Sequence, residues 1–576
     1  MAIEMSAEKP APKRRTTLVA LALVVIVIAA VGAYVVLRPQ PQAPPPTDLS
    51  TFTLVNQSDP SSLDPAVYFD ESYRFTDATY QGLTAITTDN KVLPVLATSW
   101  ESNADGTEWT FHLRSGVKFQ DGTDFNADAV KYSFERVMTI NKGGAYLLTF
   151  PLKEIQVVDP LTVKFLLNYP QPWDLVMAAG YAVKVVCPAI VKAHDAGGDL
   201  GQGWMMDHTC GTGPYKIDEW VRGQQVSLSK FADYWGGWEG KHVDKVIIKI
   251  VREYSSMKMM LQEGSVDMVI GDTIPWEEVP LLKQTSGISV DVEPTFNIIY
   301  FRFNTLKPPL DNVLVRQALA YSFPYDDVAN KIYLGNLKLP HGVIPEGIWG
   351  YDPSVPRYTL DLDKARSLLT QAGYKDGGFT LSFMSTVDDN LRRSVELWSE
   401  QLSQLGIKIE PQYVPWETVF ASATNRETQP DIAYHLWWPS YPDPFDYLFG
   451  MFHSSQDGVF NWSHFNNTEY DNLIMEGNTA SSTDKQKAAQ LYSQAERIVV
   501  DAAESIIVGQ LQLATAMKPW VHGFSQNPYY TTIVPLYNIY KAVEPAQSQQ
   551  PATPQVLVNA PTETSPAVAI KAKVTT

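Results

Sequence analysis

An uncharged run of twenty residues near the start of the chain, Leu18 to Leu37, constrains its fold and location more than any other feature. As a helix rising 1.5 Å per residue, this run is about 30 Å long, which matches the apolar thickness of a bilayer. Basic residues cluster at 13–15, before the run, and no such cluster follows it. The chain is therefore expected to begin inside the cell and to place its main body outside.

Two interpretations of this run stay open, an uncleaved membrane anchor over 17–38 and a cleaved signal sequence. Val31-Gly32-Ala33 is a tolerable processing site, but the run is long for a signal sequence, which favours the anchor. Residues 1–16 would then form a short cytoplasmic N-terminus, and the Pro-rich residues 39–48 an extended linker. Because no second run of 18 apolar residues follows, the chain is not a multi-span transporter.

The main body is predicted to be an acidic, well-packed α/β structure over 49–541. The chain has 45 Lys and Arg against 63 Asp and Glu, a net charge of −18, which argues against nucleic-acid binding. Hydrophobic residues make up 45% of the chain, enough for a large core, whereas 542–576 is Pro-rich without aromatic residues and is predicted to be disordered. The apolar patterns predict strands over 51–56, 108–113, 161–167, 245–251 and 407–413, and helices over 124–137, 312–322, 361–372, 391–405 and 484–501.

The chain has only two cysteines, Cys187 and Cys210. This number excludes Cys₄ zinc sites and C-x-x-C redox motifs. In an exported chain the two cysteines most simply form one disulfide, and two buried free thiols are the alternative.

No motif for catalysis, metal binding or cofactor binding is found. H-E-x-x-H and G-x-S-x-G are absent, and the glycine-rich stretch Cys210–Tyr215 lacks the spacing of a phosphate-binding loop. Pro214 also removes a backbone donor that such a loop would need. No catalytic residue, metal ligand or cofactor is therefore predicted. An exported carbohydrate-active enzyme and a surface sensory or adhesion protein remain as alternatives, although no pair of carboxylates stands out.

Several segments resemble, in order, the family 5 extracellular solute-binding proteins, the receptors of dipeptide, oligopeptide and nickel ABC importers. Each match is weak alone, but together they extend over nearly the whole body. The matching segments are Ser61–Pro65, Tyr80–Leu83, Phe119–Val130, Gly211–Tyr215, Asp233–Gly237, Phe303–Ala320, Ala372–Tyr374, Leu405–Ile407 and Tyr441–Pro444.

This resemblance implies a two-lobed clamp of the type II (cluster C) periplasmic-binding-protein class with an inserted subdomain. A monomer of this kind captures a small solute, an oligopeptide or an oligosaccharide, between its lobes and delivers it to the ABC permease without transforming it. A Cys187–Cys210 bridge would fasten the end of the insertion beside the turn at 211–215. By analogy, lobe I comprises 49–90, 211–295 and 516–541, the insertion 91–210, and lobe II 296–515.

The resemblance also implies that the ligand pocket is aromatic. Trp416 matches a position whose ring lines the pocket in this family, and a core tryptophan is the alternative interpretation. The segment 434–444 has many aromatic residues and prolines, which suits a rigid loop beside a strand end. If the chain is extended there, Trp437 and Trp438 point in opposite directions, so only one of them is expected to face the ligand.

Two positions of this loop depart from the peptide-binding members of the family. Ser440 lies where those members have an acid that pairs with the peptide ammonium, and Tyr434 lies near the position where some oligopeptide binders have an arginine. The loop therefore predicts an uncharged ligand, which makes an oligosaccharide a serious option beside a peptide. Asp443 is a further pocket candidate, and capping of a helix over 445–449 is its alternative role.

Overall fold

The computed structural model describes residues 46–68, 72–531 and 533–543. The predicted N-terminus (1–16), the membrane anchor (17–38), most of the linker (39–48) and all but the first two residues of the tail (542–576) lie outside the described residues. Within the described part, no helix is both long and apolar enough to cross a membrane. The chain divides into two units, Met1–Ala542 and Val543–Thr576, and the first contains the folded body.

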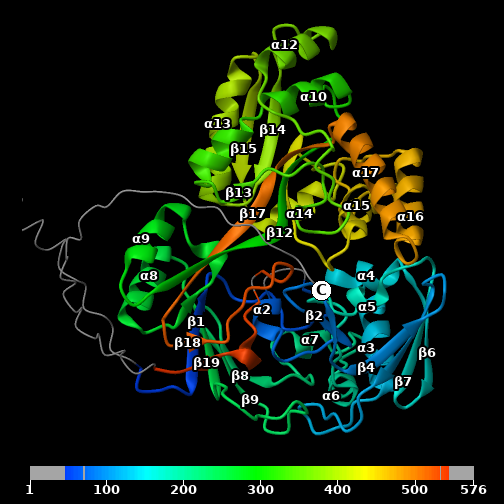
Figure 1. Ribbon diagram of the computed structural model, residues 1–576, viewed down its shortest axis with the longest axis vertical. Helices are drawn as coiled ribbons and strands as arrows, with labels where there is room; N and C mark the ends of the chain where they lie inside the picture. The colour runs from blue at the N-terminus through cyan, green and yellow to red at the C-terminus, as the bar shows by residue number, and fades with distance from the viewer. Residues whose placement is uncertain (1–45, 69–71, 532, 544–576) are drawn as a thin grey trace, which may run out of the picture. The chain divides into compact units, whose positions relative to one another are not determined.

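An eleven-stranded mixed sheet extends through the body (Figure 1). Its strands follow the order β15-β14-β16-β12-β17-β11-β1-β10-β9-β8, and β13 pairs with β17. The strands are β1 (Thr51–Asn56), β8 (Tyr215–Val221), β9 (Gln225–Lys230), β10 (Lys245–Ile250), β11 (Met268–Val269), β12 (Ser289–Phe303), β13 (Leu337–Lys338), β14 (Thr380–Ser385), β15 (Lys408–Tyr413), β16 (Ile432–Trp437) and β17 (Ser505–Met517).

The two longest strands, β12 and β17, connect the two parts of this sheet (Figure 1). They pair antiparallel from Ser289 opposite Met517 to Arg302 opposite Ser505, and their register shifts between Pro294 and Ile298. Before the shift, the residues of β12 are exposed or half-buried, and from Thr295 onward every residue is buried. The shift therefore coincides with the passage of β12 from an open part of the sheet into a part that is covered on both faces.

Helices cover the two parts of the sheet separately (Figure 1). A typical one is α13, in which Asp388 accepts a hydrogen bond from the Leu391 amide (2.7 Å) and the apolar stripe continues to Leu402. Trp398 on this stripe is fully buried and donates to Ser322 Oγ (2.9 Å). The helices of this body are α8 (Tyr254–Glu263), α9 (Val279–Gln284), α10 (Val313–Ser322), α11 (Tyr325–Asp327), α12 (Leu362–Gln371), α13 (Asp389–Ser403), α14 (Trp416–Ala423), α15 (Pro444–Phe452), α16 (Thr468–Ser481) and α17 (Lys485–Ala502).

A separate four-stranded sheet lies in the segment that was predicted to be an insertion. Its order is β4-β5-β7-β6, and Phe111, Phe134 and Phe165 pack in the core between this sheet and α3. The strands are β4 (Ala97–Ser102), β5 (Glu108–Leu113), β6 (Leu152–Asp159) and β7 (Thr162–Leu167), and the helices are α3 (Ala127–Ile140), α4 (Tyr146–Thr149), α5 (Trp173–Val176), α6 (Pro188–Ala193) and α7 (Gln202–Met205). The helix α2 (Tyr73–Thr76) lies outside this four-stranded sheet, and so do two small two-stranded sheets. One pairs β2 (Thr84–Ile86) with β3 (Val92–Pro94), and the other pairs β18 (Val521–His522) with β19 (Tyr540–Lys541).

All ten predicted elements are present, and the largest shift is that of α3, predicted over 124–137. Asn126 has an extended backbone and its side chain accepts from the Ala129 amide (3.0 Å), so the helix begins at Ala127. It ends at Ile140, because Asn141 adopts a left-handed conformation with φ of 50°. The side chain of Asp121 accepts from the amide and hydroxyl of Thr123 in a turn before the helix.

The disulfide between Cys187 and Cys210 is confirmed, and the alternative of two free thiols is wrong. The Cα atoms of the two cysteines lie 5.5 Å apart. Directly after the bridge, Gly211 and Gly213 pass against the backbone of residues 78–79. A Cβ atom on them would lie 2.2 Å from the Thr79 carbonyl oxygen and 2.3 Å from that of Ala78, respectively. The glycines of this motif therefore allow close backbone packing.

Replacing both cysteines with alanine is expected to lower the free energy of unfolding by about 3 kcal/mol. The bridge closes a loop with a sequence separation of 23, and without it the unfolded chain regains the entropy of that loop. Urea unfolding of the variant and of the wild type, with and without reducing agent, measures the difference. The reduced wild type should match the variant, and a variant as stable as the oxidised wild type would contradict the prediction.

Candidate functional site

The alternation of β16 separates the predicted pocket residues Tyr434 and Trp437 onto opposite faces of the sheet. Tyr434 is 8% exposed and packs in the core beside Trp416, with ring centroids 6.4 Å apart. Trp437 is 3% exposed, donates its indole N–H to Asp446 Oδ2 (3.0 Å) and packs on Gly450. Both side chains therefore lie in the interior and line none of the described cavities.

Trp416 lies at one end of a row of stacked rings. It is the first residue of α14 and is half-buried, with its ring 6.0 Å from that of Trp462. Trp462 in turn stacks on His435 with a centroid distance of 4.0 Å and an interplanar angle of 15°. Burial lowers the pKa of His435 well below its ordinary value, and the nearby positive charge of Arg302 lowers it further. His435 is therefore neutral at physiological pH, which suits its place in an apolar stack.

Trp438, directly after β16, is the predicted residue that reaches a pocket formed by distant segments. Its side chain is half-buried and lines a small cavity of about 10 Å³. The other residues that line this cavity are Tyr73, Gly180, Tyr181, Pro439, Tyr529, Tyr530 and Ile533. Of the two neighbouring tryptophans, this one lines the cavity, whereas Trp437 lies in the core. The aromatic residues around the cavity are Tyr73, Tyr181, Trp438, Tyr529 and Tyr530.

Ser440 connects this loop to the segment 146–181. Its hydroxyl hydrogen-bonds the Tyr181 hydroxyl (3.0 Å) and the Tyr146 hydroxyl, and its amide donates to Asp446 Oδ2 (3.0 Å). The side chain is 1% exposed. Burial raises the pKa of both tyrosines, so the cluster consists of neutral hydroxyl groups.

Asp443 caps α15, as its alternative interpretation proposed. Its Oδ1 accepts from the Phe445 amide (2.9 Å) and its Oδ2 from the Trp349 indole N–H (3.1 Å). Burial raises the pKa of Asp443 to about 6. The residue also lines a cavity of about 360 Å³ together with Asp174 and Lys485, apart from the pocket of Trp438.

A cavity of about 250 Å³ adjoins the Trp438 pocket and shares Gly180, Tyr530 and Ile533 with it. It is lined by Asp77 and Lys184, which sequence reasoning did not single out. The sequence does contain one signal that could have identified Lys184. It is the single charged residue in the otherwise apolar stretch 181–187.

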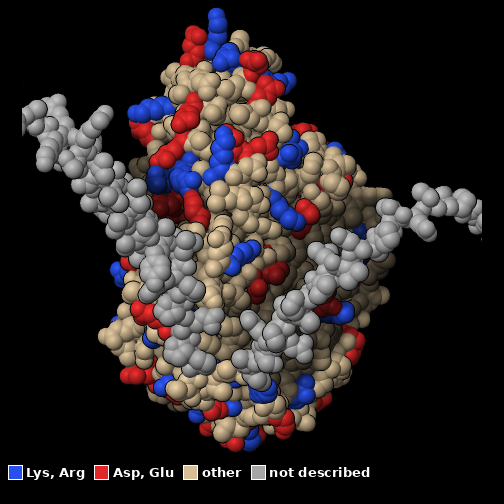
Figure 2. All heavy atoms as spheres, turned by 60° about the vertical axis from the view of Figure 1, so that its left-hand side comes forward, with Lys and Arg blue, Asp and Glu red and all other residues tan. Residues whose placement is uncertain are grey.

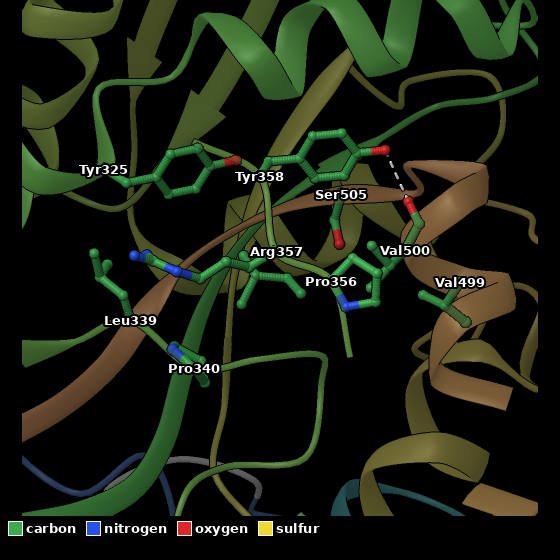
Figure 3. Close-up of a pocket in the computed structure, with 10 residues that line it drawn as sticks. Tyr325, Leu339, Pro340, Pro356, Arg357, Tyr358, Val499, Val500 and Ser505 are labelled. Atoms are coloured by element: carbon green, nitrogen blue, oxygen red, sulfur yellow. Dashed lines mark hydrogen bonds between the residues drawn. The ribbon is translucent and has the colours of Figure 1, made fainter. Parts of the chain in front are cut away.

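Figure 3 shows a further cavity, of about 20 Å³, between Tyr325, Arg357, Tyr358 and Val500. There the Tyr358 hydroxyl donates to the Val500 carbonyl (2.9 Å). This space lies beside α17 and β17, and none of the predicted site residues lines it.

Neither the face shown in Figure 2 nor the cysteines indicate a nucleic-acid or metal site among the described residues. On the face shown in Figure 2, basic and acidic side chains are interspersed, and no continuous basic stripe crosses it. Within the described residues, the one grouping of three metal-ligating side chains is Asp121 with Cys187 and Cys210. Both cysteines are used in the disulfide, so this grouping cannot hold a metal ion.

Comparisons with known proteins agree with this architecture. The family model of the bacterial extracellular solute-binding proteins, family 5 (Middle), matches residues 91–459. The probable D,D-dipeptide-binding periplasmic protein DdpA of Escherichia coli (strain K12) is 33% identical over 482 residues, which cover 82% of this chain and 90% of that protein. Heme-binding protein A of Haemophilus influenzae is 30% identical over 459 residues, with 76% and 82% coverage.

Among solved structures, the ABC transporter-associated periplasmic binding protein DppA from Helicobacter pylori, in complex with the peptide STSA, has a TM-score of 0.75. It is 25% identical, and the match covers 85% of this chain and 98% of that chain. The predicted two-lobed α/β periplasmic-binding-protein fold is thus confirmed, and this protein binds a solute rather than acting as an enzyme. The chain belongs to the bacterial extracellular solute-binding proteins of family 5.

Proposed function

We propose that this protein is the extracytoplasmic substrate-binding component of an ABC importer and that it captures short peptides between its two lobes. The observation that supports this proposal most directly is the small aromatic pocket around Trp438 together with the cavity of about 250 Å³ that adjoins it. Segments far apart in the sequence meet there, and four tyrosines surround the tryptophan. Such a concave aromatic site can pack against peptide side chains and the planes of peptide groups.

The relatives favour peptides over saccharides as ligands. DdpA is named as a D,D-dipeptide-binding protein, and the Helicobacter pylori structure holds a peptide of four residues. Haem is the other ligand named among the reported relatives, and the cavity of about 250 Å³ is small for a macrocycle of that size. An oligosaccharide remains the second candidate, because tyrosine and tryptophan faces also stack on sugar rings.

On this proposal, the lobes keep the boundaries given above, and β12 and β17 are the strands between them. The register shift between Pro294 and Ile298 provides a place where the sheet can bend. The hydrogen bonds of Ser440 with Tyr146 and Tyr181 join the proposed lobe II to the proposed insertion. They would break when the clamp opens and form again when it closes on the ligand.

Peptides are expected to stabilise the full-length protein against thermal unfolding. A ligand present at 100 times its dissociation constant adds about 2.7 kcal/mol to the free energy of unfolding. The panel consists of L-alanyl-L-alanine, D-alanyl-D-alanine, the tetrapeptide Ser-Thr-Ser-Ala, cellobiose and maltotriose. Trp438→Ala should weaken binding of the active peptide about tenfold, because it removes the aromatic wall of the pocket.

Trp220→Ala is the matched control. Trp220 is half-buried on β8 and hydrogen-bonds Asp59, and it lines none of the cavities described above. It should leave the affinity unchanged. Stabilisation by the sugars alone would overturn the peptide proposal and favour a saccharide receptor instead.

A further inference from the structure

The cavity of about 250 Å³ beside the Trp438 pocket contains two opposite charges. Lys184 comes from the stretch before the disulfide, and Asp77 directly follows α2. Other parts of the wall come from residues 80–86 and from 530–537. Since the cavity shares three residues with the pocket of Trp438, a ligand held there could extend into it.

Lys184 is a buried cation, and its charged partner in the described part of the chain is Asp77. Its side chain is 9% exposed, and its ammonium nitrogen forms an ion pair with Asp77 Oδ1 at 3.6 Å. An ammonium group carries three N–H donors, and burying them unpaired is costly. The cavity therefore contains a cation that can donate to a ligand beside its contact with Asp77.

Asp77 provides the complementary acceptor. Its side chain is 31% exposed, and Lys184 is the ion partner that the described residues offer it. Burial raises the pKa of Asp77, and the charge of Lys184 partly offsets this effect. Both charged groups line the cavity, and each has hydrogen-bonding positions beyond their mutual contact.

The neutral polar groups around the cavity are, by contrast, already engaged. The Tyr234 hydroxyl accepts from the Gln81 side chain (3.1 Å), and the Tyr530 hydroxyl donates to the Ala178 carbonyl. The Thr84 hydroxyl donates to the Asp174 carbonyl (2.7 Å). A ligand that enters the cavity would meet Lys184 and Asp77 as its main polar partners.

We propose, resting on the proposed function, that Lys184 binds the terminal carboxylate of the peptide ligand and Asp77 accepts the N–H of the same terminal residue. In a peptide the last N–H and the carboxylate are attached to one α-carbon, so they can meet two neighbouring opposite charges. An uncharged saccharide could hydrogen-bond both groups through its hydroxyls, but it brings no carboxylate to form a charge-assisted pair with Lys184. The expectation of an uncharged ligand rested on Ser440 and Tyr434, which lie outside this cavity.

The test compares L-alanyl-L-alanine and D-alanyl-D-alanine with their C-terminal amides, by calorimetry on the full-length protein. The wild type is expected to bind the acid about 30-fold or more tightly than the amide, because the amide loses a charge-assisted hydrogen bond. Lys184→Met keeps the aliphatic stem and removes the charge, so it should weaken acid binding by a similar factor and remove the preference. Lys184→Arg should retain the preference.

Lys91→Met is the matched control, because Lys91 is 74% exposed and pairs with Asp89 at the surface. It should bind both probes as the wild type does. Equal binding of acid and amide by the wild type would overturn this inference even if Lys184→Met did not fold. A preference that survives in Lys184→Met would also overturn it, although peptide binding itself would stand. If neither dipeptide nor the tetrapeptide binds, the proposed function fails, and this inference fails with it.

Discussion

Replacing Arg136 with methionine is expected to lower the free energy of unfolding by about 3–5 kcal/mol. The two terminal nitrogens of Arg136 donate to the two oxygens of Asp64 at 2.8 and 2.5 Å, in a bidentate ion pair. The side chains are 1% and 0% exposed, and the Nε–H of Arg136 donates to the Leu200 carbonyl (2.8 Å). Without Arg136, the Asp64 carboxylate would be buried without its counter-charge, which accounts for most of the expected loss.

Urea unfolding measures this loss, and two further variants test its cause. The double variant Arg136→Met with Asp64→Leu removes both charges and should lose less stability than Arg136→Met alone. Arg366→Met is the matched surface control, since Arg366 is 49% exposed and pairs with Asp363. It should change the free energy of unfolding by no more than about 0.5 kcal/mol. Similar losses for Arg136→Met and Arg366→Met would contradict the prediction.

This ion pair also explains what one family-like segment does in the fold. Asp64 belongs to Ser61–Pro65, one of the segments that carry the resemblance, and Arg136 lies on α3. The same carboxylate accepts from the Ala66 amide (3.0 Å). The motif therefore fixes the chain after β1 to the core of the four-stranded sheet and α3, and it takes no part in the pockets described above.

The secondary structure could be predicted well because its signals are local. The strands over 51–56 and 108–113 have the predicted bounds. The alternation of apolar and polar side chains indicates which face of each strand is buried and where the strand begins and ends. The helix predicted over 391–405 begins two residues earlier, at Asp389, because Asp388 supplies the cap. The joining of two sheet parts by β12 and β17 was not predictable in this way, because pairing between residues near 290 and 517 has no local signal.

The candidate site could be predicted only where the sequence concentrates unusual residues. The loop 434–444 was found from its composition, and Trp438 indeed lines a cavity. Tyr434 and Trp437 lie in the core, because β16 places them on opposite faces that are both covered. Tyr73 and Tyr181, across the cavity, lie more than 250 residues earlier in the chain, and no spacing relates them to Trp438. Tertiary packing alone brings these residues together.

The free energy of unfolding is expected to fall as the pH rises from about 5 to 8, and Glu496 on α17 is expected to be a main cause. One oxygen of its fully buried carboxyl accepts from the amides of Val343 (2.7 Å) and Ile344 (2.8 Å). The other oxygen is buried without a partner among the described residues. Burial outweighs these two hydrogen bonds and raises the pKa of Glu496 from its ordinary 4.5 to about 8.

The direction of the effect follows from which state holds the proton. Between about pH 4.5 and 8 the unfolded chain loses the proton of Glu496 while the folded chain keeps it, so each pH unit favours unfolding by about 1.4 kcal/mol. Over the range from pH 5 to 8 this amounts to roughly 4 kcal/mol. The glutamine of Glu496→Gln cannot titrate. Between pH 5 and 8 the free energy of unfolding of this variant should therefore fall by roughly 4 kcal/mol less than that of the wild type.

Urea unfolding at pH 5, 6, 7 and 8 measures both slopes. A smaller decrease should remain in Glu496→Gln, because burial also raises the pKa of Glu504 and of Asp446, each to about 7. Glu400→Gln, at an exposed position on α13, is the matched control and should follow the wild type at every pH. Parallel curves for the wild type and Glu496→Gln would mean that the carboxyl is already ionised in the folded protein, and a cation or water would then have to reach its unpartnered oxygen.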